Sequence, residues 1–147
     1  MNLIPLVGTA DIPFGTSESD ILQRLGPPTT TQSLSEVDGY PSSRRVLNYA
    51  QCGFLVTPEL GTIAVTAVAS EKSTICLWGT DVSKMSPDEL GDYLRVAGQT
   101  VVIKRDSQWD DVDVEALDCG VIASFCEGTF ESIDIHDPSW RQYLGSA

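Results

Sequence analysis

Two stretches of the chain repeat the same order of apolar and polar positions. Residues 52–68 and residues 119–135 each begin with Cys-Gly and continue with an apolar run. Each then turns at a glycine followed by a threonine, Gly61 in the first stretch and Gly128 in the second, and ends in alternating positions. An apolar run and a period-two segment joined by a glycine turn are typical of a β-hairpin. The match between the two stretches predicts a tandem repeat of small units.

A helix signal precedes each predicted hairpin. Ser17 is a favourable N-cap for a helix of about two turns, which Gly26 and the prolines after it end. Residues 86–89, Ser-Pro-Asp-Glu, form a predicted capping box, and apolar residues follow at helical spacing over residues 90–97. Each unit is therefore expected to begin with one short helix.

Alternating and apolar segments predict the other strands, whereas the polar, turn-rich residues 29–43 predict a long loop. Short connections between strands favour antiparallel pairing. One short helix per unit is too little to cover both faces of a sheet. The further predicted strands are residues 2–7, 44–50, 73–79, 100–104 and 109–116.

We therefore predict an α+β fold in which two tandem helix-then-antiparallel-sheet units form one domain with an open sheet face. Residues 1–72 are the first predicted α+β repeat, and residues 73–147 are the second. Joined in tandem, the two sheets would form one broad surface. We expect the functional site on that surface.

The strand predicted at residues 109–116 alternates acidic and apolar residues. Because side chains alternate between the faces of a strand, its valines and alanine are expected to point to the core and its acids to the other face. An exposed tryptophan beside a line of carboxylates is typical of an interface with a basic partner. The alternative is a solvated strand face with the tryptophan packed under a loop. The candidate partner-binding residues are Trp109, Asp111, Asp113 and Glu115.

Two further residues are candidates for partner contact. Tyr40 follows Asp38-Gly39 in the predicted loop, and His136 is the single histidine. In the last predicted strand Asp134 and His136 share one face, which leaves an enzymatic or ligand-binding site there as an alternative. The chain has no G-x-S-x-G motif, so these residues do not predict a nucleophilic triad.

The net charge is the property of the composition that bears most on the kind of partner. The chain has 9 basic and 21 acidic residues and a net charge of −12, which no fold requires. Such a surface repels phosphates, so nucleic-acid binding is not expected, and it favours fast capture of a basic partner. Solubility alone is the alternative explanation of the charge.

The four cysteines and the single histidine do not predict a metal site, because no C-x-x-C pair is present. No catalytic residue and no cofactor are predicted either. Cys119 and Cys126 are expected in one strand on opposite faces, and all four cysteines are expected to be reduced thiols. These cysteines are Cys52, Cys76, Cys119 and Cys126.

No apolar run approaches the ~20 residues that a membrane helix needs. The first seven residues are apolar but contain no Lys or Arg, and Pro5 interrupts them, so they predict no secretory signal. We therefore expect a cytoplasmic protein that does not bind a membrane.

The segment GTSESDILQRLGPP, at Gly15–Pro28, is similar to the helical part of the repeats in the β-lactamase inhibitory protein fold and in small bacterial lipoproteins of that fold. A second, looser copy at Met85–Gly98 lacks the Leu-Gly-Pro ending. The resemblance implies a tandem layout whose concave sheet grips another protein. The acidic character of the chain is also similar to that of bacterial immunity proteins, many of which neutralise basic nuclease toxins.

These observations together predict a non-enzymatic inhibitor, an immunity protein that occludes a basic bacterial toxin or effector with its acidic sheet face. We expect a monomer or a weak dimer. One alternative is an acidic, dimeric secretion chaperone for an effector, which would need longer helices. A second alternative is a small enzyme or ligand-binding domain that uses the Asp134/His136 face.

Overall fold

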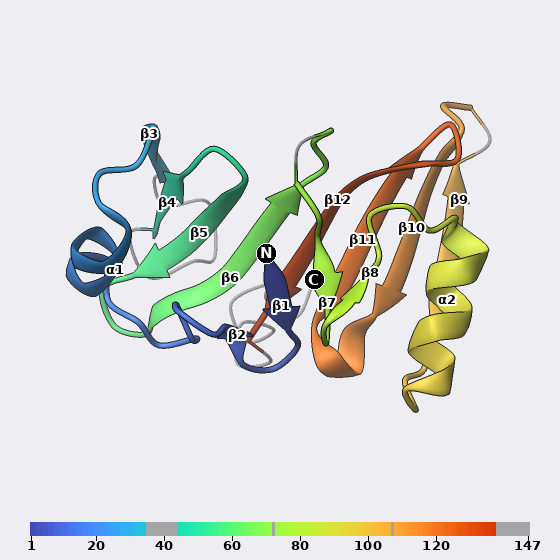
Figure 1. Ribbon diagram of the computed structural model, residues 1–147, viewed down its shortest axis with the longest axis horizontal. Coiled ribbons are helices and arrows are strands. Elements are labelled where there is room, and N and C mark those ends of the chain that lie inside the picture. The colour runs from blue at the N-terminus through green and yellow to red at the C-terminus, as the bar shows by residue number, and fades with distance from the viewer. Residues whose placement is uncertain (35–43, 72, 107, 138–147) are drawn as a thin grey trace.

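The computed structural model describes residues 1–34, 44–71, 73–106 and 108–137 and contains two sheets and two main helices (Figure 1). The eight-stranded sheet is antiparallel throughout, with the order β3-β4-β5-β6-β12-β11-β10-β9. The four-stranded sheet has the order β2-β1-β7-β8, in which β1 and β7 are parallel. The predicted α+β class is confirmed.

The bounds of the elements follow chain order. The first half contains β1 (Asn2–Ile4), β2 (Gly8–Thr9), α1 (Glu18–Leu25), β3 (Thr30–Leu34), β4 (Arg44–Asn48), β5 (Cys52–Thr57) and β6 (Gly61–Val68). The second half contains β7 (Cys76–Leu77), β8 (Thr80–Asp81), α2 (Pro87–Val96), β9 (Val102–Asp106), β10 (Asp111–Ala116), the 3₁₀ turn η1 (Leu117–Cys119), β11 (Val121–Cys126) and β12 (Thr129–His136). Both halves thus run through two short strands, one α-helix and four longer strands.

The helices and the small sheet lie on one face of the large sheet, and the hydrophobic core lies between the layers (Figure 1). Ile21 of α1 and Leu90 and Leu94 of α2 are buried there, together with Leu3 of β1 and Leu77 of β7. In the part of the chain that the structure describes, no helix or strand covers the opposite face, which we call the outer face.

Side-chain caps explain where both helices begin. The Ser17 hydroxyl accepts a hydrogen bond from the backbone N–H of Asp20, at 3.2 Å. Ser86 and Glu89 form the predicted capping box, each accepting from the backbone N–H of the other, at 3.2 and 3.1 Å. These bonds satisfy amide groups that a helix start would otherwise leave unpaired.

Three local predictions were wrong. Thr30–Leu34, predicted as part of a loop, pairs with β4 as the edge strand β3. The strand predicted at residues 73–79 is instead the β7–β8 hairpin, since Trp78 and Gly79 both adopt positive φ and reverse the chain. Cys119 lies in η1 and not in a strand with Cys126. Each difference comes from a turn or an edge pairing that carries no hydrophobic period.

No helix of the described residues is both long enough and apolar enough to span a membrane. The longer of the two α-helices has 10 residues, against the ~20 that a bilayer requires.

The β5–β6 hairpin is fastened to the segment that leads into α1. Thr62 donates to the Thr16 carbonyl through both its backbone N–H, at 2.8 Å, and its hydroxyl, at 2.7 Å. Gly15 donates in return to the Thr62 carbonyl, at 2.9 Å. The chains approach so closely at Gly61 that a Cβ there would lie 2.4 Å from the Gly15 carbonyl oxygen. This contact requires glycine at position 61.

We predict that Gly61→Ala destabilises the protein more than Gly128→Ala. Both glycines have positive φ, so each alanine incurs about 1–2 kcal/mol of backbone strain. A Cβ at Gly128 meets nothing within 4 Å, whereas one at Gly61 meets backbone and incurs about 1–3 kcal/mol more. Urea unfolding of the two variants measures the difference. Equal free energies of unfolding would contradict the close approach at Gly61.

Candidate partner-binding face

Strand register places one row of residues across all eight strands on the outer face. The adjacent row on the other side of the sheet contains Leu47, Phe54, Val65, Ile135 and Val121, all buried in the core. Because side chains alternate along each strand, the outer row is directed away from that core. From β3 to β9 the outer row is Thr30, Asn48, Gly53, Thr66, Asp134, Ile122, Glu115 and Val102.

The three predicted acids of β10 share the outer face, because Val112, Val114 and Ala116 alternate with them and are buried. Their surroundings differ, however. Asp111 is exposed and Asp113 is half-buried. The carboxylate of Glu115 is 3.1 Å from the Lys104 ammonium, and its side chain is only 11% exposed. Glu115 is therefore already neutralised within the chain, and the accessible negative charge of β10 comes from the two aspartates.

Trp109 lies in the turn before β10 and not in the strand itself. Asp110 has a φ of 54°, a left-handed conformation that breaks the strand alternation expected for Trp109. Trp109 is 66% exposed, so it is not packed under a loop. An aromatic side chain with this much apolar surface in water is a favourable anchor for a partner protein.

Several acidic residues lie in or beside the turn that contains Trp109. The Glu127 backbone N–H donates to the Asp110 carbonyl at 3.0 Å, which holds the β11–β12 turn beside the β9–β10 turn. Asp106 is paired in register with Asp111. We call Trp109, Asp106, Asp110, Asp111 and Glu127 together the acidic tip. Local sequence patterns do not indicate Asp106 or Glu127, because the β9–β10 register places Asp106 opposite Asp111 and the hydrogen bond between the two turns places Glu127 beside Asp110.

The pKa of the Cys126 thiol is affected by the carboxylates at the acidic tip. Loss of solvent around the thiol raises its pKa, and a hydrogen bond to Asp111 and the charges of Asp111, Glu131 and Glu127 raise it further. Nearby carboxylates raise a thiol pKa because they disfavour a second negative charge. The tip therefore presents a negative potential to an approaching protein.

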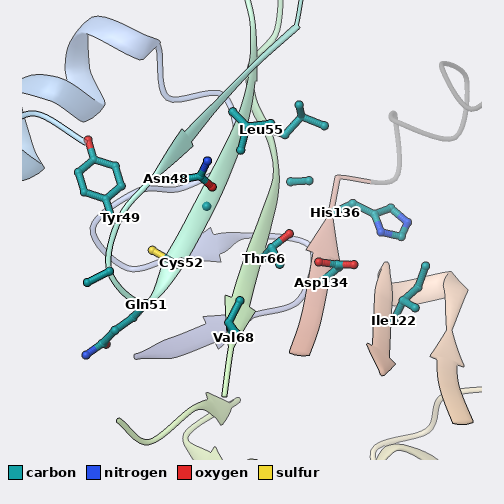
Figure 2. Close-up of a pocket in the computed structure, with 14 residues that line it drawn as sticks. Asn48, Tyr49, Gln51, Cys52, Leu55, Thr66, Val68, Ile122, Asp134 and His136 are labelled. Atoms are coloured by element: carbon teal, nitrogen blue, oxygen red, sulfur yellow. The ribbon is translucent and has the colours of Figure 1, made fainter. Parts of the chain in front are cut away.

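A pocket of about 360 Å³ lies in the middle of the outer face, and we call it the central pocket (Figure 2). Val46, Leu55, Ala64 and Ile122 give it apolar walls. Gly53 also lines the pocket, and a Cβ at this position would lie 2.9 Å from the side-chain oxygen of Asn48. Figure 2 shows Thr66 of β6 and Asp134 of β12 side by side in this pocket.

Asp134 is the carboxylate of the central pocket. Burial raises the pKa of Asp134, a hydrogen bond from the Thr66 hydroxyl lowers it, and the charge of Asp113 raises it. The net direction is upward, so the pocket disfavours the ionised form of this carboxyl group. Among the described residues, Asp134 has no ion pair with a Lys or Arg.

His136 also lines the central pocket, but it is only 2% exposed. Its backbone N–H donates to the Gly120 carbonyl at 2.9 Å, which holds the end of β12 against the residue that precedes β11. His136 is therefore part of the pocket wall and not of the outer surface. Tyr40 lies outside the described residues.

The described residues contain no group of three or more His, Cys, Asp or Glu side chains arranged to hold a metal ion. The thiol that lines the central pocket belongs to Cys52, and burial raises its pKa to about 11. Because the thiolate is the reactive form, this thiol is a poor nucleophile at neutral pH.

We predict that Asp134→Asn makes the protein more stable relative to wild type at neutral pH and that this gain disappears in acid. The folded pKa of Asp134 is raised, so wild type is relatively most stable below the unfolded carboxyl pKa of about 3.9 and loses that stability as pH rises through the folded value. Asparagine keeps an acceptor for Thr66 and removes the charge.

The measurement is urea unfolding of both proteins at several pH values. Asp113, Glu115 and His136 also face this region and are present in both proteins, so the difference between the two proteins isolates Asp134. A difference that does not change with pH would contradict the raised pKa.

Comparisons with protein-family models, with curated proteins and with solved structures found no match for this chain.

Proposed function

We propose that this protein is a non-enzymatic inhibitor of the immunity-protein type, which binds and occludes a basic protein toxin or effector with its outer face. The observation that carries the proposal is the acidic tip, where Trp109 is 66% exposed among unneutralised carboxylates. An exposed aromatic supplies contact area, and the acids attract a cationic surface.

The ion pairs of the described residues support this choice of surface. Three of the four pairs involve a residue of α1 or α2, where they join helix to strand or lie within the helix. The fourth, Lys104 with Glu115, is on the outer face. Asp111 and Asp113 belong to none of the four. Asp111 is also exposed, so its charge is accessible to a partner at this face.

The order of the elements supports the tandem-unit interpretation behind this proposal. Two short strands, one helix and four strands occur twice in the same order, and β6 pairs with β12 at the centre of the large sheet. The two longest hairpins each contain one irregularity in strand register, at Leu55/Val56 and at Ser124/Phe125. Two such units side by side give the broad sheet that an occluding inhibitor needs.

A secretion chaperone fits the structure less well. A chaperone of that kind would need long helices and a dimer interface, whereas α1 has 8 residues and α2 has 10. A ligand-binding role has one specific observation in its favour, the central pocket at Asp134. We consider that pocket below as part of the same binding face.

We predict that the double variant Asp111→Lys/Asp113→Lys associates more slowly with the partner and with a weaker dependence on salt. Charge reversal removes the attraction that steers a basic protein, an effect of about 10-fold or more on the association rate at low ionic strength. The partner is first captured from native lysate and identified, and its association rate is then measured by stopped flow at several salt concentrations.

The matched control is Glu59→Lys/Glu71→Lys, which changes net charge equally at two exposed residues outside β10. Trp109→Ala should instead accelerate dissociation, since a central aromatic is typically worth about 2 kcal/mol or more in an interface. An association rate that both double variants change equally would contradict the proposed face, and a partner with an acidic surface would contradict the proposed function.

A further inference from the structure

We propose that the central pocket receives one lysine or arginine side chain of the partner protein, with Asp134 pairing its charged head group and the apolar walls packing against its methylene stem. This inference rests on the proposed function, and it assigns a second, chemically distinct contact to the same outer face.

The size of the pocket limits its occupant. About 360 Å³ is near the lower end of the range for ligand pockets, which begins at about 300 Å³. A helix or strand of a partner is too wide for a pocket of this volume, but one long side chain fits. The floor is the sheet itself, so the occupant enters from the outer face.

The chemistry of the walls selects an amphipathic cation. Val46, Leu55, Ala64 and Ile122 offer apolar surface, and Asp134 is the carboxylate among the lining residues. Lysine and arginine have the matching distribution, an apolar stem that ends in a cation. A neutral apolar occupant would leave the carboxylate buried and unpaired, and an anionic one would meet it directly.

Within the described part of the chain, no Lys or Arg forms an ion pair with Asp134. No Lys or Arg is among the lining residues, and Lys104, which lies on the same face, pairs with Glu115. The other groups that face Asp134 are Asp113, which adds negative charge, and the Thr66 hydroxyl, which donates one hydrogen bond. The other titratable side chains that line the pocket are those of His136, Tyr49 and Cys52. A cation from a partner would therefore find an uncompensated carboxylate.

The pocket is tested first without the partner, by titrating the folded protein with n-butylguanidinium and n-butylammonium while recording amide NMR spectra. Saturable shifts centred on Thr66, Ile122 and Asp134 are expected. The neutral control is n-butanol, which should cause at most small shifts. Asp134→Asn should weaken binding of both cations by about tenfold or more, because a charge-assisted pair is lost. Glu59→Gln, which removes an exposed acid outside both the pocket and the acidic tip, should leave the affinity within about twofold.

Three results would overturn the pocket site: no saturable shift, equal binding of n-butanol, or equal binding by the Asp134→Asn protein. The amide spectrum of each variant shows whether it is folded. Thr66→Val serves as a second variant, since it keeps the volume and removes the hydrogen bond to the ionised carboxylate. It should also weaken binding of the cations.

The source of the cation is tested with the captured partner. Asp134→Asn should accelerate dissociation by about tenfold or more without changing the salt dependence of association, which the acidic tip governs. If the cations bind but this variant leaves partner binding unchanged, the pocket takes a free amine or guanidine and the proposal of a partner side chain is wrong. The proposed function would survive that result, whereas failure to find a basic partner would overturn the function and leave the pocket measurement standing.

Discussion

The pairing of β6 with β12 is the constraint on which the rest of the structure depends. Register from Val68–Ser132 to Ala64–His136 joins two four-stranded halves into one sheet. A slip of one residue would turn Ile133 and Ile135 out of the core and Asp134 into it. The apolar alternation of β12 therefore fixes the register. The same register brings Asp134 beside Thr66 and so creates the polar part of the central pocket.

Burial of one face of the large sheet determines which positions of β10 are free to carry acidic residues. The core side of the large sheet needs apolar residues at every second position, and β10 provides Val112, Val114 and Ala116. The intervening positions are free of that requirement, and two aspartates without ion pairs among the described residues occupy them. Acids on one strand face repel one another, and Lys104, which lies opposite Asp113 in the register, offsets part of that repulsion. These are the positions that the proposed partner would meet.

Features with a hydrophobic period or a cap could be predicted from the sequence, and features set by backbone pairing could not. Both helix starts and the outward direction of the β10 acids follow from local chemistry. The edge strand β3 is polar and is held by its ladder with β4, so its residues carry no alternation to detect. The position of Trp109 was predicted incorrectly because Asp110 adopts a left-handed conformation. The central pocket depends on two strand pairings that place Gly53 and Asp134 on either side of Thr66, which no local pattern contains.

The two parts of the outer face act over different distances, and this separation bears on specificity. Unneutralised acids at the tip attract any cationic surface across about a Debye length, ~8–10 Å at moderate salt, so by themselves they discriminate weakly. In the proposed interface the central pocket would act only on contact, and a partner whose cation is misplaced would leave Asp134 unpaired. Ile122 in the pocket and Cys126 at the tip are four residues apart on β11, ~13 Å along the strand. A basic protein with a lysine or arginine at that distance from its main cationic patch would satisfy both, and most basic proteins would not.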